Sequence, residues 1–378
     1  MLDQDTFCTL LETVVNMDSG SYDAQGTTQV AQWFAQRFEK LGWQATWYDP
    51  MPEKLGKSVF LAPPGTDEFD LFIVCHVDTV FPKGEVAKRP FSKDDKRLYG
   101  PGVGDMKAGC LFTLLAIEQL LAEKVPLGRI GVFFNPEEEI SSVHTRPIIE
   151  SYCQKSRIVI TAEPARPDGG NVKKRKGINR YTLTFEGKSA HAGNNPQDGI
   201  CTNTEMAHWI LFFKSLENTG KGITVNPGIA KGGTSANSIA ERAELHVDVR
   251  TCEQEDALAI DRAVRAHPPT NPKVKITIEG GIARPPMVPN ARSEELAELV
   301  KEINDGLGLE TQWAFAGGGS DASFASALNK PALCALGPVC GRAHSPEEYV
   351  EIEGLDLRFQ KFKEIIRRFS TYQFKSKP

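Results

Sequence analysis

Short apolar segments alternate with helical patterns through the first half of the chain. Apolar residues recur every three or four positions from Thr28 to Trp43 and from Lys107 to Glu123, which predicts two amphipathic helices. Runs rich in apolar and β-branched residues at Leu71–Cys75, Arg129–Phe134 and Arg157–Ala162 predict buried strands. This alternation predicts an α/β fold in which helices cover both faces of a sheet.

The pattern changes between about Gly177 and Pro285 and then returns to helix and strand signals. Tyr181, Leu183 and Phe185 alternate with polar residues, as in a strand with one buried face. A β-α-β-β-α-β order follows, which predicts a ferredoxin-like domain at 178–285 inserted between 1–177 and 286–378. The remaining elements of that order are helices at 199–216 and 254–267 and strands at 223–230, 241–250 and 274–278. After it come a helix near 293–307, a strand near 332–336 and a final amphipathic helix from residue 354.

Composition and charge exclude several classes of protein. The chain has 378 residues, which suits two domains, and its net charge of −5 argues against a nucleic-acid partner. The basic run Lys173–Lys176 predicts a solvated loop. No stretch approaches the ~20 apolar residues of a membrane helix, so no membrane partner is expected. The eight cysteines form no Cys-x-x-Cys pair and the N-terminus shows no secretory signal, which together predict a cytoplasmic protein.

Polar residues cluster where the predicted strands end. His76 follows the first strand, Asn135–Glu137 follow the second and Glu163 follows the third. Ligands of open α/β sheets collect beyond the carboxyl ends of strands, so these residues point into one crevice. Imidazole and carboxylate groups are ligands for paired zinc ions, which hydrolyse amides, and Glu138 is a further carboxylate for proton transfer. The predicted ligand set is His76, Asp105, Glu139, Glu163 and His344.

Several motifs, in order along the chain, resemble the zinc aminoacylase/carboxypeptidase family. Members of that family include glutamate carboxypeptidases, acetylornithine deacetylases and succinyl-diaminopimelate desuccinylases, and the overall likeness is greatest to the first. The resemblance runs from His76 to Val350. It implies a zinc-exopeptidase-like mixed sheet with helices on both faces and an inserted α+β domain that serves as a lid and in dimerisation. The motifs are His76–Thr79, Gly100–Gly109, Glu137–Glu139, Glu163–Pro164, Ser189–Gly193 and Gly317–Ala322.

The resemblance also implies how two zinc ions per subunit are held. His76 and Glu163 hold one ion, Glu139 and His344 hold the other, and Asp105 bridges both. Co²⁺ or Mn²⁺ would suit the same ligands.

Two features beside these ligands are implied as well. Asp78 accepts the second ring N–H of His76 and so fixes its tautomer. The peptide bond after Asp105 is cis.

Three consecutive glutamates leave the register of the catalytic pair open by one residue. The family pattern has the general base first and the metal ligand second. Matching from Phe134 places the base at Glu138 and the ligand at Glu139, while Glu137 takes a position often held by another acid. An offset of one residue would move both roles. The sequence also departs from the family at Ser141, where a glycine is common.

The inserted domain supplies substrate-binding candidates by the same resemblance. His191 donates to the oxyanion and reaches across from a partner subunit, which implies a homodimer. Arg250 clamps the free carboxylate of the substrate, with Asn237 nearby, and the alternative for Arg250 is a surface ion pair. The glycines around Gly318 let the substrate backbone approach closely, and Arg284 is a candidate for a second acidic group.

These observations predict a di-zinc metallopeptidase that releases a C-terminal amino acid from a small peptide or an N-acyl amino acid. An N-acyl amino-acid deacylase is the alternative, because it uses the same metal chemistry with a different pocket. A non-catalytic binding protein with the same fold is a third hypothesis.

Overall fold

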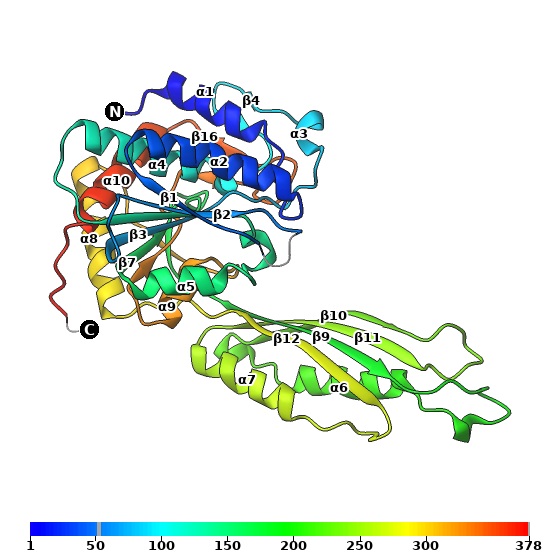
Figure 1. The fold of residues 1–378 in the computed structure, drawn as a ribbon. Coiled ribbons are helices and arrows are strands. Elements are labelled where there is room, and N and C mark those ends of the chain that lie inside the picture. Colours follow the sequence, from blue (N-terminus) through cyan, green and yellow to red (C-terminus); the bar gives the residue numbers. More distant parts are fainter. Residues whose placement is uncertain (51–53, 377–378) are drawn as a thin grey trace. The chain divides into compact units, whose positions relative to one another are not determined.

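The computed structural model describes residues 1–50 and 54–376 and divides into two compact units (Figure 1). Unit 1 comprises Met1–Lys174, Val288–Ala316 and Ser320–Pro378, and unit 2 comprises Arg175–Met287 with Gly317–Gly319. The predicted insertion of 178–285 lies within the main segment of unit 2. The sequence had placed Gly317–Gly319 in the catalytic domain, whereas these glycines belong to unit 2, where Gly319 packs against Arg284.

A six-stranded mixed sheet forms the centre of unit 1. Strand β3 (Phe69–His76) runs parallel to its neighbours β6 (Ile130–Asn135) and β7 (Ser156–Thr161), so the carboxyl ends of these three strands lie at one edge. The three central strands predicted from the sequence are confirmed. The predicted strand near 332–336 is shorter, at Ala332–Leu333. The full order is β1 (Gln44–Tyr48), β2 (Ser58–Ala62), β6, β3, β7 and β14 (Ala332–Leu333), with β1 and β2 antiparallel to their neighbours.

Helices cover both faces of this sheet, as predicted. Figure 1 shows α2, α4 and α10 on one face and α5 and α9 on the other. Phe112 of α4 contacts Phe7 and Phe359, with ring centroids 5.6 and 5.3 Å away, so α1 and α10 pack around α4. The unit 1 helices are α1 (Gln4–Val15), α2 (Ala24–Lys40), α3 (Glu85–Lys88), α4 (Ala108–Ala122), α5 (Arg146–Gln154), α8 (Ala291–Leu307), α9 (Ala322–Ala327) and α10 (Leu355–Phe369). Within the described ranges, every helix is too short or too polar to cross a membrane.

The basic run at Lys173–Lys176 is not the solvated loop that the sequence predicted. Its first three residues end strand β8 (Asn171–Arg175), which pairs with β13 (Trp313–Ala316). The Lys173 ammonium lies 2.6 Å from Glu294, and Arg175 is only 9% exposed. Alternate residues of a strand face opposite sides, so a dense basic run can still bury one of its members.

A further small sheet has the order β15 (Cys340–Gly341), β16 (Tyr349–Glu351), β5 (Arg97–Tyr99) and β4 (Ser92–Lys93).

Unit 2 has the β-α-β-β-α-β order predicted from the sequence. Its four strands are antiparallel in the order β10-β11-β9-β12, which is the ferredoxin-like arrangement. Leu183 and Phe185 of β9 and Trp209 of α6 are buried in one apolar cluster between sheet and helices. The elements are β9 (Gly177–Glu186), α6 (Thr202–Ser215), β10 (Thr224–Gly232), β11 (Arg242–Thr251), α7 (Gln254–Ala266) and β12 (Lys275–Arg284).

Candidate metal centre

His76 closes the central strand β3 and is 1% exposed. Its Nδ1 lies 3.0 Å from the main-chain carbonyl of Asp78 and 3.4 Å from the Asp78 carboxylate, so the carbonyl is the nearer acceptor. An Nδ1–H donated to that carbonyl leaves Nε2 as the nitrogen for a metal. Nε2 lies 3.1 Å from Oδ1 of Asp105.

Asp105 lies between the two predicted imidazole ligands. Its Oδ1 is 3.1 Å from Nε2 of His76, and its Oδ2 is 3.2 Å from Nε2 of His344. One oxygen therefore faces each ring, as a bridging carboxylate requires. The predicted cis peptide bond between Asp105 and Met106 is confirmed.

Glu139 completes a compact group of donor atoms. Single donor atoms of His76, Asp105 and Glu139 all lie within 4.8 Å of one another, and Oε2 of Glu139 is 3.2 Å from Nε2 of His344. Its Oε1 is buried and has no hydrogen-bond partner anywhere in residues 1–50 and 54–376. Burial and the charge of Asp105 raise the pKa of Glu139 to about 7. A buried carboxylate oxygen without a donor is costly unless a cation fills the space, so the donor set fits a metal centre.

Glu163 adds negative charge beside His76. It follows strand β7 and is 7% exposed. Burial lowers the pKa of His76, but Asp105, Asp78 and Glu163 outweigh this and hold the pKa well above its ordinary value. The charge balance around His76 therefore favours a cation.

The three glutamates Glu137–Glu139 occupy different environments. Glu137 is 1% exposed, and its carboxylate accepts hydrogen bonds from the backbone N–H groups of His144 and Thr145. It also lies 2.9 Å from the ring of His144. Glu138, in contrast, is half-buried, and Glu139 turns towards Asp105 and His344. Glu137 is thus engaged in holding its own loop, which favours the register with Glu138 as base and Glu139 as ligand.

Asp78 and Ser21 position this loop. The Asp78 carboxylate accepts the backbone N–H groups of Glu138 and Glu139, each at 3.0 Å, and the hydroxyl of Ser21 at 2.7 Å. The sequence identified Asp78 but not Ser21, because a serine far away in sequence gives no spacing signal. At Ser141, where the resemblance implies that glycine is common, φ is +82°, a left-handed conformation that glycine adopts more easily.

Glu348 is a positioning residue that the sequence analysis missed. It is 1% exposed and accepts the backbone N–H groups of Gly102, Gly104 and Asp105 at 3.1, 2.8 and 2.9 Å. Burial raises the pKa of Glu348 to about 7, although these donors act in the opposite direction. The available signal was an acidic residue four positions after His344, in the segment that returns to the site.

We expect Glu348→Ala to lower the free energy of unfolding by about 2–3 kcal/mol, because three buried N–H groups lose a charged acceptor. The matched control is Glu347→Ala, since the neighbouring carboxylate is 67% exposed and a surface change should stay within about 0.5 kcal/mol. Urea unfolding of the metal-free protein measures both variants. Equal stability of the two would mean that Glu348 does not hold the Asp105 loop.

In unit 2, the backbone fixes the tautomer of His191. Its Nδ1 accepts the backbone N–H groups of Gly193 at 3.1 Å and Asn194 at 3.0 Å, so the ring proton lies on Nε2. His191 is exposed and forms a β-bridge with Ser238, while the N–H of Ala192 donates to the carbonyl of Asn237. Unit 2 thus brings the two predicted residues His191 and Asn237 onto adjacent loops and presents an N–H donor.

Three arginines surround the Gly317–Gly319 segment of unit 2. Arg250 contacts both carboxylate oxygens of Asp248, at 2.6 and 3.0 Å, and its third nitrogen lies 3.3 Å from the carbonyl of Gly317. The side chain of Arg284 is 2% exposed, and a Cβ on Gly319 would lie 2.4 Å from its Cδ. Arg175 donates to the carbonyls of Gly318 and Gly319.

This arrangement changes two expectations from the sequence. Arg250 forms an ion pair with Asp248, which was the alternative interpretation of this residue from the sequence. One of its nitrogens still lies beside the carbonyl of Gly317. Around a Cβ placed on Gly317 or Gly318, no atom of the described residues lies within 4 Å, so these two positions offer space. Gly319 instead allows close packing of Arg284. Arg175 was missed because its basic neighbours suggested a loop.

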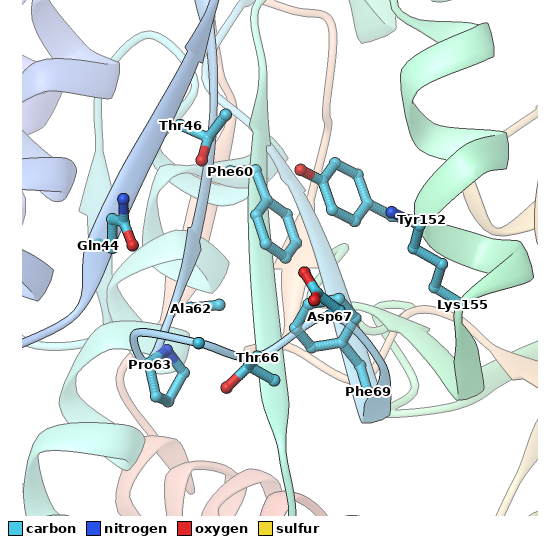
Figure 2. Close-up of a pocket in the computed structure, with 11 residues that line it drawn as sticks. Gln44, Thr46, Phe60, Ala62, Pro63, Thr66, Asp67, Phe69, Tyr152 and Lys155 are labelled. Atoms are coloured by element: carbon cyan, nitrogen blue, oxygen red, sulfur yellow. The ribbon is translucent and has the colours of Figure 1, made fainter.

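A separate cavity of about 300 Å³ opens at the other end of β3 (Figure 2). The rings of Phe60 and Tyr152 stack there with centroids 3.7 Å apart, beside Phe69 at the start of the strand. Asp67 and Lys155 are the charged residues of its described lining, and no imidazole is among them. The imidazole and carboxylate donors that suit a metal lie instead at the opposite end of β3, beyond His76.

Comparisons with known proteins give a family match, relatives in sequence and a similar fold. Residues 72–368 match the family described as Peptidase family M20/M25/M40. Carboxypeptidase G2 from Pseudomonas sp. (strain RS-16) is 29% identical over 359 residues, which cover 92% of this chain and 85% of that protein. An acetylornithine deacetylase from Erwinia tasmaniensis is 26% identical over 321 residues, covering 80% and 81%. The M20 family metallo-carboxypeptidase Sso-CP2 from Sulfolobus solfataricus has the same fold, with a TM-score of 0.75 at 18% identity, covering 98% of this chain and 100% of that one.

Proposed function

We propose a reaction and a substrate class from one premise: the chain belongs to Peptidase family M20/M25/M40 and is a metal-dependent hydrolase. The proposed reaction is hydrolysis of an amide bond that releases a C-terminal amino acid, as in a glutamate carboxypeptidase. The observation that carries the proposal is the position of Asp105, whose two carboxylate oxygens face the rings of His76 and His344. Beside it, Oε1 of Glu139 is buried and has no hydrogen-bond partner among the described residues.

In this proposal two zinc ions are held by the five predicted ligands, His76, Asp105, Glu139, Glu163 and His344. Bound divalent ions of this kind polarise the scissile carbonyl and lower the pKa of water. Glu138 removes the proton of the attacking water and delivers it to the leaving amine. Asp78 supports both steps, because its carboxylate fixes the backbone of Glu138 and Glu139.

His191 is proposed as the hydrogen-bond donor to the oxyanion, supplied by a partner subunit in a homodimer. Support comes from its tautomer, since Nδ1 accepts two backbone N–H groups and Nε2 therefore carries the proton. A preorganised donor of this type contributes about 10²–10³-fold to the rate.

The three arginines of unit 2 favour an acidic product. A glutamate has two carboxylates and needs a cation for each, which Arg250 and Arg284 can provide beside Arg175. Asp248 pairs with two nitrogens of Arg250, and the third, which lies 3.3 Å from the carbonyl of Gly317, is the one offered to a substrate carboxylate. The open positions at Gly317 and Gly318 leave room for the substrate backbone, and Asn237 contributes an amide.

A matched substrate series tests this proposal. We expect zinc-loaded protein to hydrolyse N-benzoylglutamate with a kcat/KM at least about tenfold above that for N-benzoylornithine and N-benzoylleucine, because a site built for a charged group rejects analogues that lack it. Arg284→Met should remove most of this preference. A preference for the ornithine derivative, retained in Arg284→Met, would favour the deacylase alternative, which the acetylornithine deacetylase relative supports. No hydrolysis of any of the three would contradict the proposed release of a C-terminal glutamate.

A further inference from the structure

A cavity of about 470 Å³ in unit 1 opens beside the candidate metal centre. Its lining includes the ligand Glu139 and the apolar residues Tyr22, Val80, Phe81 and Ile140. Tyr22 is 78% exposed and Val80 is 43% exposed, so both side chains are open to a ligand. The volume lies within the range of about 300–1,000 Å³ that is usual for small-molecule sites.

The apolar wall of this cavity is rigidly connected to the catalytic loop. The loop that carries Tyr22 bridges to the segment after His76 through Gly20 and Thr79, and a Cβ on Gly20 would lie 2.2 Å from the carbonyl oxygen of Phe81. Ser21, next to Tyr22, donates to Asp78, which in turn holds the backbone of Glu139. The wall and the metal ligand are therefore fixed by the same carboxylate.

Two of the three charged residues in the described lining of the cavity form an ion pair. Lys83 lies 3.2 Å from Asp23, and Asp23 also accepts the backbone N–H of Gly26. One face of Phe81 is covered by Arg89, whose guanidinium carbon lies 4.7 Å from the ring centroid. The surface that remains for a ligand is formed mainly by Tyr22, Val80 and Ile140 and is apolar.

We propose that this cavity receives the acyl side of the scissile amide, and that Tyr22 and Val80 select acyl groups with an extended apolar surface over acetyl. The inference rests on the proposed amide hydrolysis. An amide has two sides, and the arginines of unit 2 suit the amino-acid side. The cavity lined by Glu139 suits the other side, because an acetyl group would leave Tyr22 and Val80 in water, whereas a longer acyl chain would cover them. Among the described lining residues, the one cation, Lys83, is paired with Asp23.

The test keeps glutamate constant and varies the acyl group from acetyl through butanoyl and hexanoyl to benzoyl. We expect kcat/KM of the zinc-loaded wild type to rise at least about tenfold from acetyl to hexanoyl, since each well-packed methylene adds discrimination. Tyr22→Ala should reduce the hexanoyl-to-acetyl ratio about fivefold or more, Val80→Ser should reduce it less, and Tyr22→Phe should retain it. Leu357→Ala is the control, because it removes another exposed apolar side chain, at 39% exposure, away from this cavity.

The outcomes separate this inference from the proposed function. A hexanoyl-to-acetyl ratio near one in the wild type, or an unchanged ratio in Tyr22→Ala, would overturn the inference while amide hydrolysis stands. Hydrolysis of ornithine but not glutamate derivatives would contradict the glutamate carboxypeptidase proposal. The same acyl series on ornithine would then still decide whether the cavity binds the acyl group.

Discussion

Replacing Glu138 by glutamine should reduce kcat about 10²–10⁴-fold while the protein keeps its metal and its thermal stability. The carboxylate of Glu138 is the proposed proton carrier, and an amide of the same shape cannot accept the proton. The loss should appear in kcat rather than in KM, because the group acts on the reacting atoms and not on the bound substrate. Steady-state kinetics together with metal analysis of the purified variant measure this outcome.

Glu137→Gln is the matched control, since it makes the same chemical change one residue earlier. Glu137 accepts hydrogen bonds from His144 and Thr145 and is 1% exposed, so we expect a loss of about 1–3 kcal/mol in stability. Glu138→Gln should thus lower kcat at unchanged stability, and Glu137→Gln should lower the stability. If Glu137→Gln instead lost activity at full stability and Glu138→Gln lost bound metal, the register would be shifted by one residue.

The Glu138→Gln variant also serves to test the proposed role of His191. Subunits carrying His191→Ala and subunits carrying Glu138→Gln should each be inactive alone. If His191 acts across a dimer, a mixed dimer contains one site with both residues intact, and activity should return to about a quarter to a half of the wild type per dimer at saturating zinc. Mixed dimers verified by mass that show no recovery would exclude a role for His191 in the site of its partner.

Much of the fold could be predicted because its central elements are strongly apolar and contrast with the polar segments around them. Strand β3 and helix α4 are nearly continuous apolar segments, and the polar residues after β3 mark the edge where ligands collect. Edge strands such as β1, whose burial is only partial, lack that contrast and were not identified. The helix α1 precedes the first clear pattern and was also missed.

The candidate ligands could be predicted because each one lies in a short motif, whereas their supporting residues could not. Ser21 and Glu348 act through contacts with residues 57 or more positions away in sequence, for which a single sequence carries no signal. The three adjacent glutamates show the same limit. Their order was an inference from resemblance, and what distinguishes them physically is the hydrogen bonding of Glu137 and the contact of Glu139 with His344. Arg175 shows that charge density alone cannot separate a solvated run from a strand.

Replacing Asp105 by alanine should have the largest effect on metal binding. In the wild type, zinc at about 100 times its dissociation constant should stabilise the folded state by about 2.7 kcal/mol per site, because it binds the folded centre. Asp105 supplies one oxygen towards each of His76 and His344, so its loss removes a ligand from both proposed positions. We therefore expect the zinc-induced rise in Tm to disappear and the bound metal to fall from two ions per subunit to none. Asp305→Ala, which removes an aspartate side chain that is 59% exposed, is the control and should keep both.

The metal-free form of the same variant gives an independent measurement. Burial raises the pKa of Asp105, but the two imidazoles outweigh this and hold the pKa below its ordinary value, so the carboxylate is ionised between them. Its removal leaves His76 and Glu139 without their shared neighbour, and the apo protein should lose stability rather than gain it. If the variant bound one ion with an undiminished Tm shift, Asp105 would serve a single metal, and the bridged arrangement would be wrong. If it bound two, the centre would lie elsewhere, and the proposed roles of His344 and Glu139 would fail with it.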